Sequence, residues 1–242
     1  MFDKKLIKIS ILIPCFNEYN TINMIIDRVI KSLEVYNFTN YEIIIVDDFS
    51  NDGTREKLKK LSTQDKIKIF YHSKNLGKGA AIKTAIAQIS GDITIIQDAD
   101  LEYNPKDYHK ILRVLKKKKY KVVYGSRILN TNHFTKNNFT SNIRLFANHI
   151  LTITSNIINS QNLTDAHTCY KAFDSTVFKK LNLCENGFSF CPEVTTKISN
   201  LGLDIFEVKI SYNGRDYKSG KKISFMDGFD ALWTLIKYKI NK

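Results

Sequence analysis

The sequence lacks several features that mark common classes of protein. It has only three prolines and four cysteines among 242 residues, no CxxC pair, and no histidine at zinc-ligand spacing from a cysteine. This argues against a structural zinc site or a dithiol redox motif, so we interpret the cysteines as buried or free thiols. No apolar run reaches the roughly 18 residues that a spanning helix needs, and the N-terminus lacks a signal-peptide core. We therefore expect a cytoplasmic protein without a transmembrane domain.

Acidic residues are also scarce. The chain has 24 Asp and Glu against 37 Lys and Arg, which gives a formal net charge of +13. Such a charge attracts polyanions, whether nucleic acid, anionic lipid or phosphorylated substrates. A basic nucleic-acid-binding protein is one alternative, but no RNP, KH or zinc-finger signature is present. Walker A and GxGxxG spacings are absent too.

The chain shows no internal repeats and no low-complexity linkers. Residues 1–242 are therefore predicted to form a single domain with one core.

The first half of the chain contains five short runs rich in β-branched residues. They span residues 8–13, 42–47, 67–71, 92–97 and 121–125. They show little polar alternation, as expected of parallel strands covered on both faces. Helical patterns lie between them at residues 21–36, 77–89 and 105–117. This order predicts an α/β fold, with a mostly parallel sheet and helices on both faces. Ligands bind beyond the carboxyl ends of such strands, where polar clusters follow four of the five runs.

Two carboxylates, Asp98 and Asp100, follow the fourth predicted strand, with Glu102 two residues further on. Side chains two apart on a strand point to the same side, and buried carboxylates need a partner or a metal. Oxygen ligands of this kind suit Mg²⁺ or Mn²⁺. The alternative is that Asp98 caps a turn while Asp100 is solvated.

Two further motifs have both a binding and a structural interpretation. The stretch VDDFSNDGT around Asp48 can offer carboxylates to a nucleotide base or ribose, or it can be an Asx-rich turn. The stretch NLGKGAAIKTAI opens a helix with glycines on either side of Lys78, which is a plausible terminus for a phosphate. Neither motif is specific when it is considered alone.

Together, five stretches occur in order with the spacing of a known family, namely ILIPCFNE, IIVDDFSNDGT, NLGKGAA, IIQDADLEYNP and VYGSR. The chain resembles the GT-A-type family 2 glycosyltransferases. Its second half, with DAHTCYKAFDSTVFKKL, FSFCPEVTTKI and ISYNGRDYKSGKKISFMDGF, is similar to the polyprenyl-phosphate sugar transferases of the dolichol-phosphate mannose synthase group. The resemblance covers nearly the whole chain and implies a GT-A fold with C-terminal amphipathic interface helices.

The resemblance also implies roles for individual residues. The positions that contact the nucleotide sugar match Pro14, Asn17, Glu18, Asp48, Lys78 and Asp98. The positions that hold Mg²⁺ or Mn²⁺ with the donor diphosphate match Asp98, Asp100 and Glu102, where Glu102 replaces a frequent Gln. The groups that bind the acceptor phosphate match Arg127, Arg144, Arg215, Lys221 and Lys222. Catalysis is assigned to Asp100 and the three arginines. Asp165 matches a position often followed by Ser-Gly-Phe, and the chain departs from that pattern.

The expected reaction is the inverting transfer of a hexose, mannose or glucose, from GDP-mannose or UDP-glucose to a polyprenyl monophosphate, either dolichyl or undecaprenyl. A rival reaction in glycan or polysaccharide synthesis uses a hydroxyl acceptor. It needs a general base, for which Asp165 and Glu193 are the candidates. An ionised phosphate acceptor needs no such base.

Two amphipathic patterns occupy the second half. Residues 142–159 carry a polar stripe of Arg144, Asn148, Thr152 and Ser155 and an apolar stripe of Phe146, Ile150, Ile153 and Ile157. Residues 211–242 are predicted to form an acceptor loop and an amphipathic helix with an apolar stripe of Phe225, Phe229, Leu232, Trp233, Ile236 and Ile240. These stripes either lie on a membrane surface or pack as ordinary core. We expect peripheral membrane association, direct or through an anchoring partner.

Overall fold

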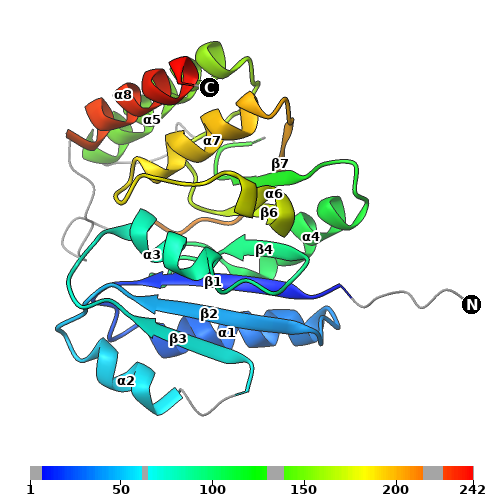
Figure 1. Ribbon diagram of the computed structural model, residues 1–242, viewed down its shortest axis with the longest axis vertical. Coiled ribbons are helices and arrows are strands. Elements are labelled where there is room, and N and C mark those ends of the chain that lie inside the picture. The colour runs from blue at the N-terminus through cyan, green and yellow to red at the C-terminus, as the bar shows by residue number, and fades with distance from the viewer. Residues whose placement is uncertain (1–6, 62–64, 130–138, 215–225, 242) are drawn as a thin grey trace, which may run out of the picture.

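The computed structural model describes residues 7–61, 65–129, 139–214 and 226–241 (Figure 1). The strands are β1 (Ile9–Cys15), β2 (Tyr41–Asp47), β3 (Ile67–Tyr71), β4 (Ile93–Ile96), β5 (Val122–Ser126), β6 (Lys171–Asp174) and β7 (Ile205–Lys209). The helices are α1 (Ile22–Val35), α2 (Thr54–Leu61), α3 (Lys78–Ile86), the 3₁₀ helix η1 (Pro105–Asp107), α4 (Tyr108–Lys116), α5 (Phe139–Asn159), α6 (Ser175–Lys180), α7 (Phe190–Asn200) and α8 (Met226–Ile240).

The strands form one sheet in the order β3-β2-β1-β4-β6-β5-β7. Neighbouring strands are parallel except around β6, which is antiparallel to both β4 and β5. The prediction of an α/β fold with a mostly parallel sheet is therefore confirmed, and the five predicted strands correspond to β1 to β5. The sequence pattern did not predict β6 and β7. Because β1, β2 and β4 are parallel neighbours, their carboxyl ends meet at one edge of the sheet.

Helices cover both faces of this sheet, as predicted. Residues of β1 alternate between two hydrophobic clusters, with Ile9, Ile11 and Ile13 in one and Leu12 in the other. The first cluster includes buried side chains of α1, α2 and α4, and the second includes those of α3, α6 and α7. Both faces are apolar, which explains why the strand sequences show little polar alternation.

Helices α5 and α8 lie with α7 at one end of the molecule, and α2 lies at the other (Figure 1). In the polar stripe of α5, Thr152 and Ser155 are buried, at 3% and 1% exposure, while Ile157 of the apolar stripe is 75% exposed. The buried face forms hydrogen bonds instead of apolar packing, since Asn159 donates to Thr196 on α7. The alternative that this apolar stripe packs as core is therefore wrong for α5.

Helix α8 also exposes part of its predicted apolar stripe, including Phe229 and Trp233, but its buried face is largely apolar and includes Ala231 and Leu235. The helix begins at Met226, and Phe225, at the start of the predicted stripe, lies outside the described residues. Among the helices that the structure describes, none has the length and apolarity to cross a membrane.

Candidate active site at the carboxyl ends of the strands

The turns that follow β1 and β2 are joined by hydrogen bonds. Asn17, which has a positive φ of 55°, donates its backbone N–H to Ser50 Oγ at 2.8 Å, and its Oδ1 accepts from the N–H of Asn51 at 2.9 Å. The N–H of Glu18 donates to Thr54 Oγ1 at 2.9 Å. The structure therefore brings Asn17 and Glu18, two of the residues assigned to the nucleotide, together with the VDDFSNDGT turn. Pro14 lies in β1 beside them.

Asp48 is buried at the end of β2 and organises the loop that leads into α3. Its Oδ1 accepts from the N–H of Leu76 and its Oδ2 from the N–H of Gly77, both at 2.8 Å. His72 Nδ1 lies 2.7 Å from Asp48 Oδ1, and His72 Nε2 lies 2.9 Å from Thr84 Oγ1. The role that the structure shows for Asp48 is thus to hold this loop, and a contact with the nucleotide stays a prediction.

The glycines around Lys78 permit close packing at the start of α3. Gly77 has a φ of 96°, and a Cβ placed there would lie 2.5 Å from the carbonyl oxygen of Asn186. A Cβ on Gly79 would collide with the carbonyl oxygen of Glu185. The N–H of Ala80 donates to the Asn186 carbonyl at 3.0 Å. This differs from the expected phosphate-facing terminus, because a peptide carbonyl already accepts one N–H of the first turn.

Lys78 instead reaches across the sheet edge to Asp98. Its Nζ lies 2.5 Å from Asp98 Oδ1, and the two side chains are only 16% and 13% exposed. Burial alone would lower the pKa of Lys78, but the neighbouring Asp98 carboxylate holds it well above its usual range. The partner that a buried Asp98 requires is therefore this lysine, 20 residues away in the sequence.

Asp98 and Asp100 lie in a turn and not on a strand. Strand β4 ends at Ile96, and Leu101 has a φ of 66°, so the period-two alternation expected from the sequence is not maintained. Asp100 Oδ1 accepts the N–H of Glu102 at 3.1 Å, and Glu102 Oε2 accepts the hydroxyl of Tyr212 at 2.6 Å.

The carboxylates of this turn are the residues predicted to hold Mg²⁺ or Mn²⁺. No three His, Cys, Asp or Glu side chains among the described residues are gathered into a set that could hold an ion, so Asp98, Asp100 and Glu102 do not form a closed cage. Mg²⁺ is usually bound by one or two carboxylates together with waters and substrate phosphates. Oxygen ligands on one turn at the sheet edge fit a site of that open kind.

Arg127 follows β5 and forms a two-pronged ion pair with Asp165. The distances are 2.7 Å from Nε to Oδ2 and 2.7 Å from Nη2 to Oδ1, and the Arg127 N–H also donates to Oδ2 at 3.0 Å. Burial alone would raise the pKa of Asp165, but the guanidinium lowers it below its usual range. Glu207 on β7 holds the same loop by accepting the N–H groups of Thr164 and Asp165.

The structure does not place the rest of the predicted acceptor group. Arg144 lies within α5, but its side chain is not described, and Arg215, Lys221 and Lys222 lie outside the described residues. Arg127 is therefore the only predicted acceptor-binding residue whose side chain is placed. Tyr212 and the Lys78–Asp98 pair were not predicted, because each depends on contacts between distant parts of the chain.

Glu193, the second candidate general base, is fully buried near the start of α7. Its Oε1 accepts the N–H of Cys184 at 2.6 Å and its Oε2 accepts the N–H of Glu185 at 2.9 Å. Lys197 Nζ lies 2.7 Å from Oε1. This carboxylate stabilises the loop that packs against α3.

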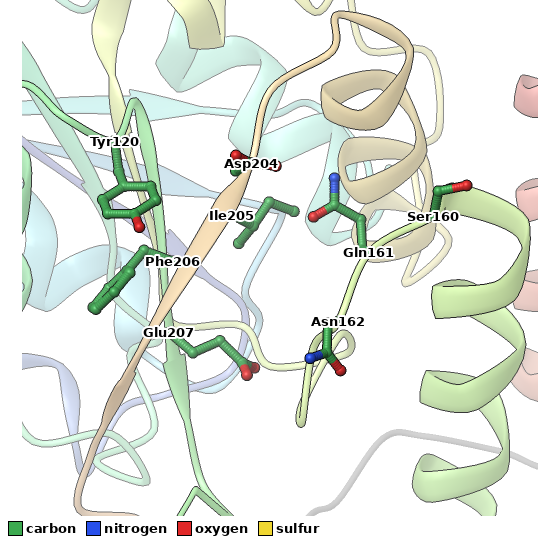
Figure 2. A pocket seen from close by; sticks show the side chains of 8 residues that line it. All are labelled: Tyr120, Ser160, Gln161, Asn162, Asp204, Ile205, Phe206 and Glu207. Carbon is green, nitrogen blue, oxygen red and sulfur yellow. The ribbon is translucent and has the colours of Figure 1, made fainter.

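A cavity of about 450 Å³ lies between the end of α5 and strand β7, and Glu207 is one of its lining residues (Figure 2). Tyr120, Asp204 and Phe206 line it, and Tyr120 and Asp204 precede the parallel strands β5 and β7. The cavity therefore opens near the starts of these strands, whereas Arg127 follows the end of β5.

Comparison with known proteins identifies the family and the fold. The model of the family described as glycosyl transferase family 2 matches residues 10–181. The chain is 27% identical, over 97% of both chains, to a UDP-N-acetylglucosamine–dolichyl-phosphate N-acetylglucosaminyltransferase of Methanococcus voltae. It is 33% identical to a dolichol-phosphate mannosyltransferase of Pyrococcus furiosus, over 45% of this chain and 30% of that protein.

Among solved structures, the chain is similar to glucosyl-3-phosphoglycerate synthase from Mycobacterium tuberculosis in complex with Mn²⁺, UDP and phosphoglyceric acid. The TM-score is 0.68 and the identity 17%, over 96% of this chain and 78% of that one. The same synthase was also crystallised with Mg²⁺ and UDP. The predicted GT-A fold is thereby confirmed.

Proposed function

The chain belongs to glycosyl transferase family 2, and on that basis we propose that it transfers a sugar, with inversion, from a nucleoside diphosphate to a polyprenyl monophosphate. Two relatives support the lipid phosphate, since their names specify dolichyl phosphate with N-acetylglucosamine and dolichol phosphate with mannose. N-acetylglucosamine therefore joins mannose and glucose as a candidate sugar, and UDP and GDP are both candidate carriers.

The observation that carries this proposal is that both candidate general bases, Asp165 and Glu193, already bind other groups of the protein. A hydroxyl acceptor needs a general base within hydrogen-bond reach, yet Asp165 is bound by Arg127 through both oxygens and Glu193 caps a loop. The lowered pKa of Asp165 further weakens it as a base. A phosphate monoester is already ionised near neutral pH, so it attacks without a base and matches this site better.

In the proposed mechanism, an acceptor phosphate oxygen bonds to the anomeric carbon as the bond from that carbon to the diphosphate breaks. Asp165 fixes the plane of Arg127, whose guanidinium has five N–H donors and uses two side-chain donors on Asp165. The remaining donors bind and align the acceptor phosphate. Asp98 and Asp100, with Glu102, would hold Mg²⁺ or Mn²⁺, which neutralises the departing nucleoside diphosphate when bound. Lys78 adds a positive charge beside them.

The proposed function predicts that a phosphate is required on the acceptor. Labelled UDP-N-acetylglucosamine, UDP-glucose and GDP-mannose are supplied in turn with Mn²⁺ and a short polyprenyl phosphate. We expect labelled lipid from one donor, and none when the matched polyprenyl alcohol replaces the phosphate. The same nucleotide should raise the unfolding temperature of the protein most, because a bound ligand stabilises the folded state. Transfer to the alcohol or to a soluble sugar, with none to the phosphate, would contradict the proposal.

We propose in addition that α5 and α8 lie on a membrane surface. The two helices pack side by side (Figure 1), and we refer to their exposed apolar side chains together as the α5–α8 surface. Its members are Ile150, Ile153, Ile157, Phe229, Trp233, Ile236 and Ile240. Lys237 and Lys239 on α8 have partners within the protein, since Lys237 Nζ lies 2.8 Å from Glu185 Oε1 and Lys239 Nζ donates to Ser199 Oγ. The proposal therefore rests on the exposed apolar side chains, which suit a membrane interface.

This surface predicts binding to anionic vesicles. Flotation with phosphatidylglycerol-containing liposomes should bring the protein to the top at low salt, and a Trp233→Ser and Ile157→Ser double variant should bind more weakly, by about tenfold per side chain. Val35→Ser is the matched control, because Val35 is 72% exposed at the end of α1, outside the α5–α8 surface. Protein that stays at the bottom without a partner, or an unaffected double variant, would count against direct binding.

A further inference from the structure

Residues 211–214 connect the sheet to the turn that carries Asp98 and Asp100. They follow β7, and Tyr212 pairs with Tyr103 in an antiparallel bridge. The N–H of Asn213 donates to the carbonyl of Glu102 at 2.9 Å. The backbone of this segment is therefore attached directly to the donor side of the candidate site. In the sequence, Arg215 follows three residues after Tyr212.

The side chain of Tyr212 contacts groups assigned to both substrates. Its hydroxyl donates to Glu102 Oε2 at 2.6 Å, a short bond of the kind formed with an ionised carboxylate. The Cζ of Arg127 lies 5.2 Å from the centre of the Tyr212 ring, within the range of a cation–π contact. The ring also packs against Tyr103, with 5.2 Å between ring centres.

A glycine in this segment lets the backbone lie close to the Tyr212 ring. A Cβ on Gly214 would lie 3.0 Å from Cε1 of that ring.

We propose that Tyr212 is a positioning residue that fixes the donor-side carboxylate of Glu102 and the acceptor-side guanidinium of Arg127 relative to each other. The inference rests on the proposed function for the identity of the two substrates. A tyrosine that only filled space would need neither its hydroxyl on one group nor its ring beneath the other. Groups that orient a metal-binding carboxylate typically change metal affinity by about 10- to 100-fold when removed.

Two substitutions separate the two contacts. Tyr212→Phe removes the hydroxyl that bonds to Glu102 and keeps the ring beside Arg127. We expect the Mn²⁺ concentration for half-maximal nucleotide binding to rise about tenfold, and the acceptor KM to change less than in Tyr212→Leu. Tyr212→Leu also removes the ring beneath Arg127, and the acceptor KM should then rise by roughly three- to tenfold. Tyr120→Phe is the matched control, because Tyr120 lies at the other end of β5 beside the cavity (Figure 2).

Calorimetry of UDP and GDP with Mn²⁺, without acceptor, measures the first effect, and initial rates of transfer measure the second. Each variant is first checked by thermal unfolding. Calorimetry needs no acceptor. A higher Mn²⁺ concentration for half-maximal nucleotide binding in Tyr212→Phe therefore supports the link to Glu102 even if the wild type does not transfer sugar to polyprenyl phosphate. An unchanged Mn²⁺ dependence in Tyr212→Phe, with a folded protein, would overturn the inference.

Discussion

Asp100→Asn will abolish sugar transfer, with an expected loss of roughly 10³-fold or more, because the substitution removes a ligand charge from the cation that stabilises the departing diphosphate. Asp100 lies in the turn after β4, where its Oδ1 already accepts the N–H of Glu102. The amide retains that hydrogen bond, so the fold of the turn should survive. Excess EDTA should have the same effect as the substitution.

Asp98→Asn should strongly reduce transfer for two reasons. It weakens the cation site, and it leaves Lys78 in a largely buried position without its carboxylate. Breaking such a pair by removing one partner destabilises a protein by about 3 kcal/mol or more when the pair is buried, and less here because both side chains keep some exposure. Urea unfolding should therefore show a stability loss for Asp98→Asn that Asp100→Asn does not show.

The control for both is Asp92→Asn, since Asp92 is exposed and immediately precedes the same strand, β4, at its opposite end. Its transfer rate should equal that of the wild type. A wild-type rate in Asp100→Asn, or full turnover in excess EDTA, would refute the metal assignment for this turn.

The sequence predicted the first half of the fold because its signal is local. The runs that became β1, β2, β4 and β5 are rich in β-branched residues and almost entirely buried, whereas β3, at the edge of the sheet, is only partly buried. Strand β6 has no comparable signal, since it is four residues long and begins with Lys171. That lysine is fully buried, with its Nζ donating to the carbonyl of Ala166 at 2.9 Å and lying 3.4 Å from the centre of the Tyr124 ring. A charged residue satisfied by the tertiary structure cannot be recognised from periodicity.

In the candidate site too, the sequence predicted individual residues but not the tertiary contacts between them. The sequence predicted roles for Lys78, Asp98 and Arg127 and named Asp165 as a candidate base, but it did not predict their pairing across separations of 20 and 38 residues. Sequence reasoning assigned Arg127 and Asp165 to rival mechanisms, whereas the structure joins them in one ion pair. Tyr212 lies in the stretch that begins ISYNGR, but the sequence assigned it no role, and only the structure shows that a bridge brings it beside Tyr103.

Helix α5 shows that periodicity can define two faces without saying which one is buried. Thr152 accepts the N–H of Ala166 and Asn159 donates to Thr196, so the polar face is satisfied inside the protein and the isoleucines lie outside. The sequence left the choice between core and membrane open for this reason.

Arg127→Lys is expected to lower transfer efficiency by about 10²-fold, because an ammonium keeps the charge but cannot bind both Asp165 oxygens and a phosphate in one plane. Two lost hydrogen bonds between charged groups account for an effect of this size. Arg113→Lys is the matched control, since Arg113 is exposed on α4. Arg144→Lys should also be damaging if its predicted role in binding the acceptor phosphate is correct.

Asp165→Asn and Glu193→Gln complete the comparison between a phosphate and a hydroxyl acceptor. If Asp165 positions Arg127, its amide variant should raise the acceptor KM while the pH dependence of kcat keeps its shape. If Asp165 or Glu193 were the general base of a hydroxyl acceptor, the corresponding amide would lower kcat by roughly 10² to 10⁴ and remove the acidic limb of that profile. Each variant is compared by initial rates between pH 5.5 and 8.5 (about the range where a base would titrate) after its folding is verified. Near-normal activity of Arg127→Lys together with an inactive carboxylate variant would reject the lipid-phosphate acceptor.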